Sequence, residues 1–433
     1  NIYELHLGSW RKKGGEKARE PSDDPSLWYA YDEIAEPLVD YLLKAGYNYV
    51  EFMPLAEYPD DASWGYQGTG FFAPTRRHGT PKQLMALVDR LHQAGIGAIL
   101  DFVPVHFALD DWGLRNFDGT ALFEYPNNDV GVSEWGSCNF MYSRGESCSF
   151  MQSCANFWLG AYHFDGLRMD AISRIIYWMG DPARGVNNEN VRFVQRMNAG
   201  LKSLHDGILL AAEDSTDYPG TTKPSGENGL GFDYKWDMGW MNDTLDFFKK
   251  TPEERKANYH KLTFSMMYYG NERYLLPLSH DENVHGKATV LNKMYGDYWD
   301  KFPQARAFYL YMYVHPGKKL NFMGGEIGQM REWDERREQD WDMLAYPVHD
   351  AFAHYMAELS GLYLDHGALS EWDYYGPGFA WLDCNQEERC LYAIERRNEG
   401  ERLVCVLNLG GSEQRDYQVG VPGAAGVDVL LHT

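Results

Sequence analysis

The stretch Ile96-Gly-Ala-Ile-Leu-Asp-Phe-Val-Pro-Val-His106 is an apolar run that carries a carboxylate near its end and a histidine after it. Three further apolar runs end in charged residues in the same way: Gly166-Leu-Arg-Met-Asp170, Gly207-Ile-Leu-Leu-Ala-Ala-Glu213 and Tyr274-Leu-Leu-Pro-Leu-Ser-His-Asp281. Short, continuous apolar runs are typical of parallel strands that are buried on both faces of a sheet. A barrel enzyme carries its active site at the C-terminal ends of such strands. The sequence therefore predicts one site, at the end of the barrel where these four runs finish.

Strand-like runs alternate with segments of helical periodicity along most of the chain, which is the pattern of repeated strand–helix units. We expect strands at about residues 2–7, 47–53, 96–103, 166–169, 207–211, 234–240, 274–278 and 319–323. Helices are expected at about residues 31–44, 82–94, 150–162 and 188–204. Together these elements predict an α/β fold, a (β/α)8 TIM barrel, with the four charged runs on its strands 3, 4, 5 and 7.

Changes in the pattern divide the chain into parts. Residues 1–365 are expected to form the catalytic barrel, including an inserted subdomain after strand 3 at about residues 106–142, a long stretch without clear period. Residues 366–433 carry short alternating runs and are expected to form a C-terminal antiparallel all-β domain. A strand-like run begins almost at once and the last domain stops early, so we expect the native chain to extend beyond both ends.

Composition narrows the classes of partner. The balance of 63 acidic against 40 basic residues, a net charge of −23, argues against nucleic acid or an anionic membrane. No uninterrupted apolar run approaches the roughly 20 residues that a membrane-spanning helix requires. The six cysteines show no C-x-x-C pair or zinc-type spacing, so reduced thiols in a cytoplasmic enzyme are expected. Aromatic residues, at 15% of the chain, suit stacking against sugar rings, but a large aromatic core explains them equally well.

The charged residues at the strand ends suit cleavage of a glycosidic bond. Arg168 and Asp170 lie two apart on one strand and share a face, so the guanidinium is expected to keep Asp170 ionised. Glu213 ends the next strand, and cleavage with retention requires two carboxyls roughly 5 Å apart, a nucleophile and an acid. Further polar groups that can bind sugar hydroxyls are His106, His280 and Asp281.

Structural explanations compete with this interpretation. A single Asp at a strand end, such as Asp101, is usually a loop hydrogen-bonder or a helix cap. Independent structural uses do not explain four charged strand ends at the same end of one barrel. The Gly-rich stretch Gly324-Gly-Glu-Ile-Gly328 lacks the Lys-Ser/Thr of a phosphate loop, so nucleotide binding is not expected.

The four runs resemble the signature regions of the α-amylase superfamily, glycoside hydrolase family 13, and the segments around them resemble the 1,4-α-glucan (glycogen) branching enzymes within it. The residues that carry the resemblance are Tyr3-Glu-Leu-His-Leu-Gly-Ser-Trp10, Trp64-Gly-Tyr-Gln-Gly-Thr-Gly-Phe-Phe-Ala-Pro-Thr-Arg-Arg77, Ala212-Glu-Asp-Ser-Thr216, Leu276-Pro-Leu-Ser-His-Asp-Glu282 with His285-Gly-Lys287, and Gly324-Gly-Glu-Ile-Gly-Gln329 with Glu332-Trp333. These segments are spread over nearly the whole chain.

The resemblance implies catalytic roles for three carboxyls. Asp170 would be the nucleophile that forms a covalent glucosyl-enzyme, and Glu213 would be the general acid/base. Asp281 would be the third catalytic carboxyl; with His280 it would bind and distort the sugar at the cleavage point, and His106 would assist.

The resemblance also implies supporting residues. Arg168 would orient Asp170, Asp101 would support Arg168, and Tyr66 would stack on the reacting sugar. Candidates for an aromatic lining on the acceptor side are Tyr66, Trp64, Trp299 and Trp333, although a core role suits any one of these tryptophans equally well. No redox or nucleotide cofactor is expected. Calcium-dependent α-amylases carry an Asn ligand where this chain has Val105, so no metal is expected at that position.

The activity implied is that of a branching enzyme of glycogen biosynthesis, a retaining transglycosylase. It would cleave an α-1,4-glucan such as amylose, glycogen or amylopectin and transfer the piece to a 6-hydroxyl, forming an α-1,6 branch. One alternative is an α-glucan hydrolase of the same superfamily, of the debranching or maltooligosyl-trehalose type. Another is a catalytically silent glucan-binding protein. The chain departs from the usual family pattern at Phe102, Val105 and Asn283, which leaves the acceptor and chain-length preference open.

Overall fold

The computed structural model describes residues 1–432, and within them parallel strands close into a barrel in the order β1-β12-β11-β10-β9-β8-β5-β2. The barrel strands are β1 (Ile2–Leu5), β2 (Tyr49–Phe52), β5 (Gly97–Phe102), β8 (Gly166–Met169), β9 (Leu209–Ala212), β10 (Tyr234–Trp236), β11 (Tyr274–Leu278) and β12 (Lys318–Phe322). The predicted (β/α)8 barrel is confirmed. The four charged runs occupy its third, fourth, fifth and seventh strands.

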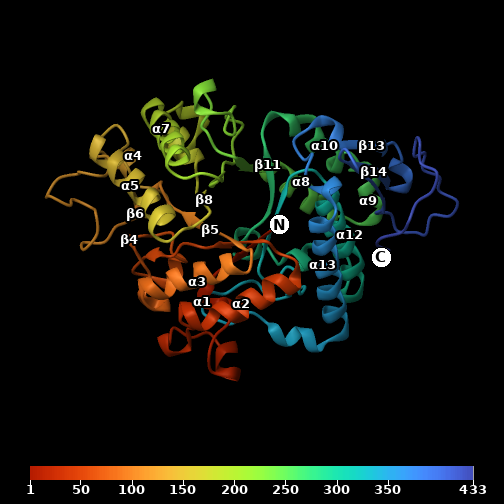
Figure 1. Cartoon of the computed structure of the whole chain (residues 1–433), viewed down its shortest axis with the longest axis horizontal. Coiled ribbons are helices and arrows are strands. Elements are labelled where there is room, and N and C mark those ends of the chain that lie inside the picture. The colour runs from red at the N-terminus through yellow and green to blue at the C-terminus, as the bar shows by residue number, and fades with distance from the viewer. Residues whose placement is uncertain (433) are drawn as a thin grey trace.

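Helices surround the barrel strands (Figure 1). The longer ones are α2 (Tyr31–Ala45), α3 (Pro81–Gln93), α5 (Gly145–Ala161), α7 (Asn188–Leu204), α8 (Met238–Lys249), α12 (Tyr298–Val314) and α13 (Pro347–Asp365). The shorter ones are α1 (Leu7–Trp10), α4 (Asn128–Gly131), α6 (Ser173–Ile176), α9 (Pro252–Ala257), α10 (Lys261–Tyr268) and α11 (Val290–Lys293). The helices predicted from periodicity are α2, α3, α5 and α7, although α5 begins earlier than expected.

Helix α3 illustrates how the local sequence sets these elements. Thr80 and Gln83 form a capping box at its start, and Pro81 occupies the first turn, where its missing N–H is not needed. Leu84 and Leu91 recur on one face and are fully buried in the core that includes the barrel strands. Each buried leucine of this kind contributes about 1.5–3 kcal/mol relative to an exposed one.

The sixth barrel strand is shorter than expected. The sequence predicts a strand over residues 234–240, but β10 ends at Trp236. The side chain of Asp237 then accepts a hydrogen bond from the backbone N–H of Trp240 and so caps α8. The apolar residues that follow Asp237 therefore belong to a helix.

The interior of the barrel has an apolar layer below a charged one. The apolar layer consists of Ile2, Ile99, Trp236, Leu275 and Leu320. Residues two apart on a strand share a face, so Glu4 lies above Ile2 and Asp101 above Ile99. The charged layer lies at the C-terminal ends of the strands, where the sequence predicts the site.

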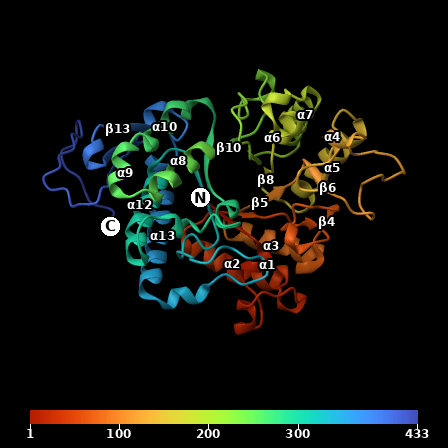
Figure 2. The same ribbon diagram turned by 180° about the vertical axis from the view of Figure 1, so that it is seen from behind.

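Of the three smaller sheets, two lie at opposite ends of the molecule (Figures 1 and 2). After β5 the chain forms an inserted antiparallel pair, β6 (His106–Ala108) with β7 (Ser137–Asn139). At the other end, β13 (Phe379–Asp383), β14 (Leu391–Arg397) and β15 (Arg402–Asn408) form the predicted C-terminal antiparallel sheet.

The C-terminal sheet packs against the outer helices of the barrel. Tyr392 and Leu407 of this sheet share one hydrophobic core with Phe308 on α12 and Leu359 on α13. Among residues 1–432, no helix combines the length and the apolar character needed to cross a bilayer.

Candidate active site

Arg168 on β8 connects acidic residues from three neighbouring strands. Its Nη1 donates to both carboxylate oxygens of Asp101, at 2.6 and 2.5 Å, and to Asp170 at 2.9 Å. Its Nη2 donates to Glu213 at 2.8 Å. The register of the sheet explains this arrangement, because Asp101 on β5 and Arg168 are direct partners and Glu213 follows the adjacent β9. The guanidinium also lies over the ring of Trp236, with its carbon 4.4 Å from the ring centroid.

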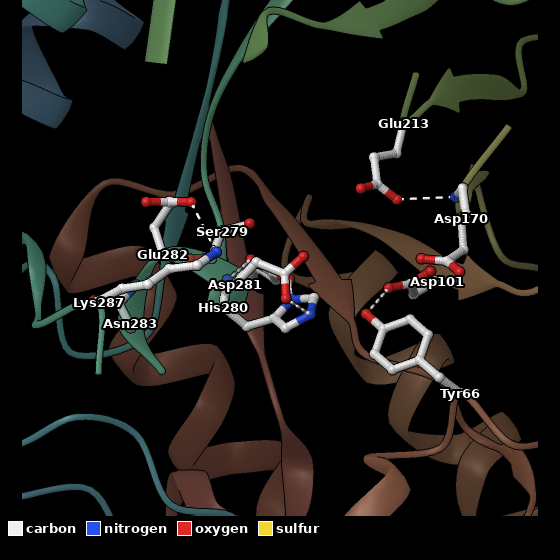
Figure 3. Close-up of polar contacts among 12 residues, drawn as sticks. Tyr66, Asp101, Asp170, Glu213, Ser279, His280, Asp281, Glu282, Asn283 and Lys287 are labelled. Carbon is white, nitrogen blue, oxygen red and sulfur yellow. Dashed lines mark hydrogen bonds and ion pairs between the residues drawn. The ribbon is translucent and has the colours of Figure 1, made fainter. Parts of the chain in front are cut away.

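Asp170 and Glu213 lie next to each other at the ends of β8 and β9, with Asp281 across a gap from them (Figure 3). Glu213 Oε2 accepts a second hydrogen bond, at 2.9 Å, from the backbone N–H of Ala171. Ala171 has a φ of 47°, in the left-handed region that a residue with a Cβ rarely adopts. This strained backbone turns the N–H after Asp170 toward Glu213 and fixes the two carboxyls relative to each other.

The electrostatics of this pair depend on burial as well as on Arg168. Burial raises the pKa of Asp170 well above its ordinary value, Arg168 opposes the rise, and Glu213 adds to it. The lowering of this pKa by Arg168, on which the sequence-based expectation rested, is therefore outweighed. Two neighbouring carboxyls repel each other when both are ionised, which opposes the effect of the guanidinium. Asp170 therefore holds a proton more strongly than an isolated aspartic acid does.

Tyr66 links the Arg168 cluster to the seventh barrel strand. It lies in the loop between β3 (Ala56–Glu57) and β4 (Gly70–Pro74), which form a small antiparallel sheet. Its hydroxyl donates to Asp101 at 2.5 Å, and its ring stacks on that of His280 with centroids 5.4 Å apart and an interplanar angle of 24°. These two contacts hold the Tyr66 ring in one orientation.

His280 is held by Glu4, a residue that the sequence analysis did not select for the site. His280 Nδ1 lies 2.6 Å from one carboxylate oxygen of Glu4, and its backbone N–H donates to the other at 3.0 Å. Burial alone would lower the pKa of His280, but Glu4 and Asp281 raise it to about 9. At neutral pH the imidazole is therefore a cation, with its Nε2 3.5 Å from Asp281.

Asp281 is the most exposed of the predicted catalytic residues, with 44% of its side chain accessible. Burial alone would raise its pKa, but His280, Arg168 and Lys287 together lower it. Asp281 is thus an ionised carboxylate that faces open space, as a group that binds a sugar hydroxyl must be.

Glu51 on β2 is a second acidic residue that the sequence analysis missed. It is 1% exposed, and neither carboxyl oxygen has a hydrogen-bond partner within the described chain. Burial raises its pKa well above the ordinary value, and the nearby Glu4 and Asp101 raise it further. Glu51 is therefore a neutral acid beneath the site. A signal for both residues was present, since Glu4 and Glu51 are the acidic residues inside otherwise apolar short strands.

The cleft above these residues has a volume of about 370 Å3. It is lined by Ser63, Trp64, Tyr66, Gln67, His106, Trp135, Asp170, Glu213, His280, Asp281 and His285. Six of the eight residues predicted for the site thus border the cleft. The other two, Asp101 and Arg168, lie behind it and are almost fully buried.

His106 lines the cleft from the start of the inserted segment. Burial, with a contribution from Arg174, lowers its pKa to about 4, so the ring is neutral at pH 7. Its Nδ1 has no hydrogen-bond partner among the described residues. A neutral imidazole can both donate and accept, which suits a sugar hydroxyl.

The aromatic walls of the cleft differ in part from expectation. Trp64 and Tyr66 line it, as the sequence analysis expected of a stacking surface. Trp333 does not, because it is 8% exposed and packs behind Trp64 at a centroid distance of 4.8 Å. Trp299 is 69% exposed but does not line the cleft either. These two candidates therefore lie outside this cleft, and Trp135 takes a place that was not predicted.

A larger cavity, of about 870 Å3, lies at the other end of the barrel. Its lining includes Asp233, Arg273 and Pro316, which precede β10, β11 and β12. The residues of the four charged runs are absent from this lining, so the chemistry is assigned to the smaller cleft. No group of three or more potential ligands (His, Cys, Asp or Glu) among residues 1–432 is arranged to hold a metal ion.

Proteins that carry the name of branching enzymes resemble the chain over almost its whole length. It is 44% identical over 424 residues, 97% of its length, to "1,4-alpha-glucan branching enzyme GlgB" of Bacillus cereus (strain AH187). The proteins of the same name from Bacillus anthracis and Bacillus mycoides (strain KBAB4) are equally similar. This chain is similar to proteins named 1,4-alpha-glucan branching enzymes. The resemblance that the sequence motifs indicate is thereby confirmed. The chain spans 64% of the length of each of these relatives.

Two further comparisons concern the fold. Residues 381–433 match the family described as "Alpha amylase, C-terminal all-beta domain". The solved α-amylase of Geobacillus thermoleovorans, complexed with acarbose, has a TM-score of 0.71 at 17% identity and covers 94% of this chain and 86% of its own. The α-amylase of H. orenii has a TM-score of 0.70 at 18% identity, with 94% and 89% covered. The fold is therefore that of the α-amylases.

Proposed function

We propose that this protein is a 1,4-α-glucan branching enzyme, a retaining glycosyltransferase that acts on glycogen or starch-like glucan in the cytoplasm. The observation that carries the proposal is the Asp170–Glu213 pair, held by one buried guanidinium at the floor of a cleft whose far side carries Asp281. The 44% identity to enzymes of this name supports a transferase over a hydrolase.

In the first half of the proposed reaction, Asp170 attacks the anomeric carbon of an α-1,4-linked glucose. Glu213 gives its proton to the departing 4-oxygen, so the C1–O4 bond breaks as an ester forms between the sugar and Asp170. Asp170 reacts as the carboxylate, the form that Arg168 stabilises against the effect of burial. Positive charge develops on the ring, and the carboxylates of Asp170 and Asp281 stabilise it from two sides.

In the second half, Glu213 acts as a base. It takes the proton of a 6-hydroxyl on another glucan, the 6-oxygen attacks the anomeric carbon, and the ester on Asp170 breaks. An α-1,6 branch forms with net retention, and Asp170 and Glu213 return to their starting states. Arg168, Asp101, Tyr66 and His280 position the carboxyls and the sugar, and His106 binds a hydroxyl.

The division of the chain forms part of this proposal. We assign residues 1–365 to the catalytic barrel, with the inserted subdomain at about residues 106–142, and residues 366–433 to a C-terminal all-β domain. The end of α13 at Asp365 and the match of residues 381–433 to a C-terminal all-beta family support this division.

The proposal is tested on amylose. A branching enzyme abolishes iodine colour with little rise in reducing ends, and isoamylase then releases short chains from the product. Reducing ends that rise in step with the loss of colour, with no α-1,6 signal in the proton NMR spectrum, would assign the protein to the hydrolases instead.

A further inference from the structure

We propose that Trp135 is a binding platform for the glucan chain and that Arg174, through its contacts with Glu134 and the Trp135 ring, is a positioning residue for that platform. The nature of the ligand rests on the function proposed above. The placement of Trp135 rests on the contacts described below.

Trp135 lies at the tip of a tight turn in the inserted segment. Gly136 donates its N–H to the carbonyl of Ser133, and Ser133 donates its N–H to the carbonyl of Ser137. The backbone N–H of Trp135 donates to the Ser133 hydroxyl at 3.2 Å, and the amide of Gln67 donates to the Trp135 carbonyl at 3.3 Å. The backbone of Trp135 is thus fixed from both the turn and the opposite loop, although the turn has no regular secondary structure.

The side chain of Trp135 remains open while its surroundings are buried. Trp135 is 49% exposed and borders the cleft that holds Asp170 and Glu213. Its ring lies 5.3 Å from that of His106, which is 3% exposed. Exposure of a large apolar ring to water beside the catalytic carboxyls costs free energy, and a ligand that covers the ring removes this cost.

Arg174 fixes the orientation of this ring. Its guanidinium carbon lies 4.6 Å from the Trp135 ring centroid, and its guanidinium pairs with the carboxylate of Glu134. Arg174 lies on α6, four residues after Asp170. One short segment therefore carries both the proposed nucleophile and the residue that contacts Trp135. Trp135 remains 49% exposed beside Arg174 and His106, so a sugar can stack on the part of the ring that these two residues leave open.

Trp64 and Trp135 form two aromatic walls of the cleft, and their positions define the path of a glucan chain through it. Trp64 is held by a hydrogen bond to Glu335 at 3.0 Å and by stacking on His285, so it forms a wall separate from Trp135. A glucan chain that places one glucose at Asp170 extends beyond a 370 Å3 cleft and needs apolar surface beside it. The faces of glucose rings are apolar, and indole stacks on such faces. Trp135 therefore contributes affinity for the chain and takes no part in the bond exchange.

The test measures binding of maltoheptaose by calorimetry in an Asp170→Asn background, which removes turnover. We expect Trp135→Ala to weaken binding about tenfold or more and Trp135→Phe to weaken it by less than about threefold. Trp112→Ala is the matched control, because Trp112 is 95% exposed in the same inserted segment and does not line the cleft. It should leave the affinity unchanged. If Trp135→Ala melts lower than its parent, Trp135→Leu replaces it.

Arg174 is tested by a double-mutant cycle. Arg174→Lys keeps a charge for Glu134 but loses the planar surface against the ring. As a single substitution it should therefore weaken binding. Added to Trp135→Ala, it should have no further effect on the affinity. Unchanged affinity in Trp135→Ala, equal losses in Trp112→Ala, or additive effects of Arg174 and Trp135 would overturn the inference. A protein that binds through Trp135 but forms no branches would refute the proposed function alone.

Discussion

Replacing Glu4 with Gln removes the charge partner of a buried, cationic histidine. The pKa of His280 rises from the 6.5 of an unperturbed histidine to about 9, an increase mainly due to Glu4. At 1.36 kcal/mol for each pKa unit, this rise corresponds to about 3 kcal/mol of folding stability. Because the folded-state pKa is raised, this stability is fully present below pH 6.5 and is lost as the pH rises through about 9.

Urea unfolding at several pH values between 6 and 9.5 measures this effect. The contribution of His280 to the free energy of unfolding of the wild type should fall by about 1.4 kcal/mol per pH unit between pH 6.5 and 9. Glu4→Gln should be about 3 kcal/mol less stable at pH 6 and should converge with the wild type near pH 9.5. Glu36→Gln, which removes the partner of Arg90 on the surface, is the control and should run parallel to the wild type. A constant difference between Glu4→Gln and the wild type across this range would refute the reasoning.

Further variants probe the remaining parts of the site. Asp170→Asn and Glu213→Gln should each lower branching activity by several powers of ten without loss of folded structure by circular dichroism; more than about a tenth of wild-type activity in Glu213→Gln would exclude it as the acid. Arg168→Ala should lose activity and about 3–5 kcal/mol of stability in urea unfolding, because it leaves buried carboxyls uncompensated; Arg168→Lys should not restore activity, since one ammonium cannot reproduce the forked contacts. Dialysis against a strong chelator should leave activity and Tm unchanged; a fall of many degrees that calcium reverses would count against the expectation drawn from Val105.

The sequence predicted the barrel because its strands are short apolar runs whose order and spacing can be read directly. It also predicted that Asp101, Arg168, Asp170 and Glu213 meet, because parallel strands place their C-terminal ends at one edge. The contact between Glu4 and His280 could not be read in this way. These residues are 276 positions apart, and their pairing depends on how the barrel closes between its first and last strands.

The parts of the site that lie on loops were the least predictable. Trp135 follows no periodic pattern, and its place in the cleft depends on a turn and on Arg174 from a different segment. Trp333 and Trp299 were candidates because of residue type alone, and burial or position removes both from the cleft. The predicted sixth strand was too long because Asp237 caps a helix that begins inside an apolar run. A single capping residue is a weaker sequence signal than the apolar run around it.

The most direct test of the proposed mechanism is to trap the sugar ester on Asp170. Glu213→Gln is incubated with α-maltosyl fluoride, whose leaving group departs without an acid, while the second step lacks its base. Mass spectrometry of the digested protein should find one maltosyl group on the peptide that contains Asp170. No such adduct, or a maltosyl group on Asp281 or another carboxyl, would contradict the assignment of Asp170 as the nucleophile.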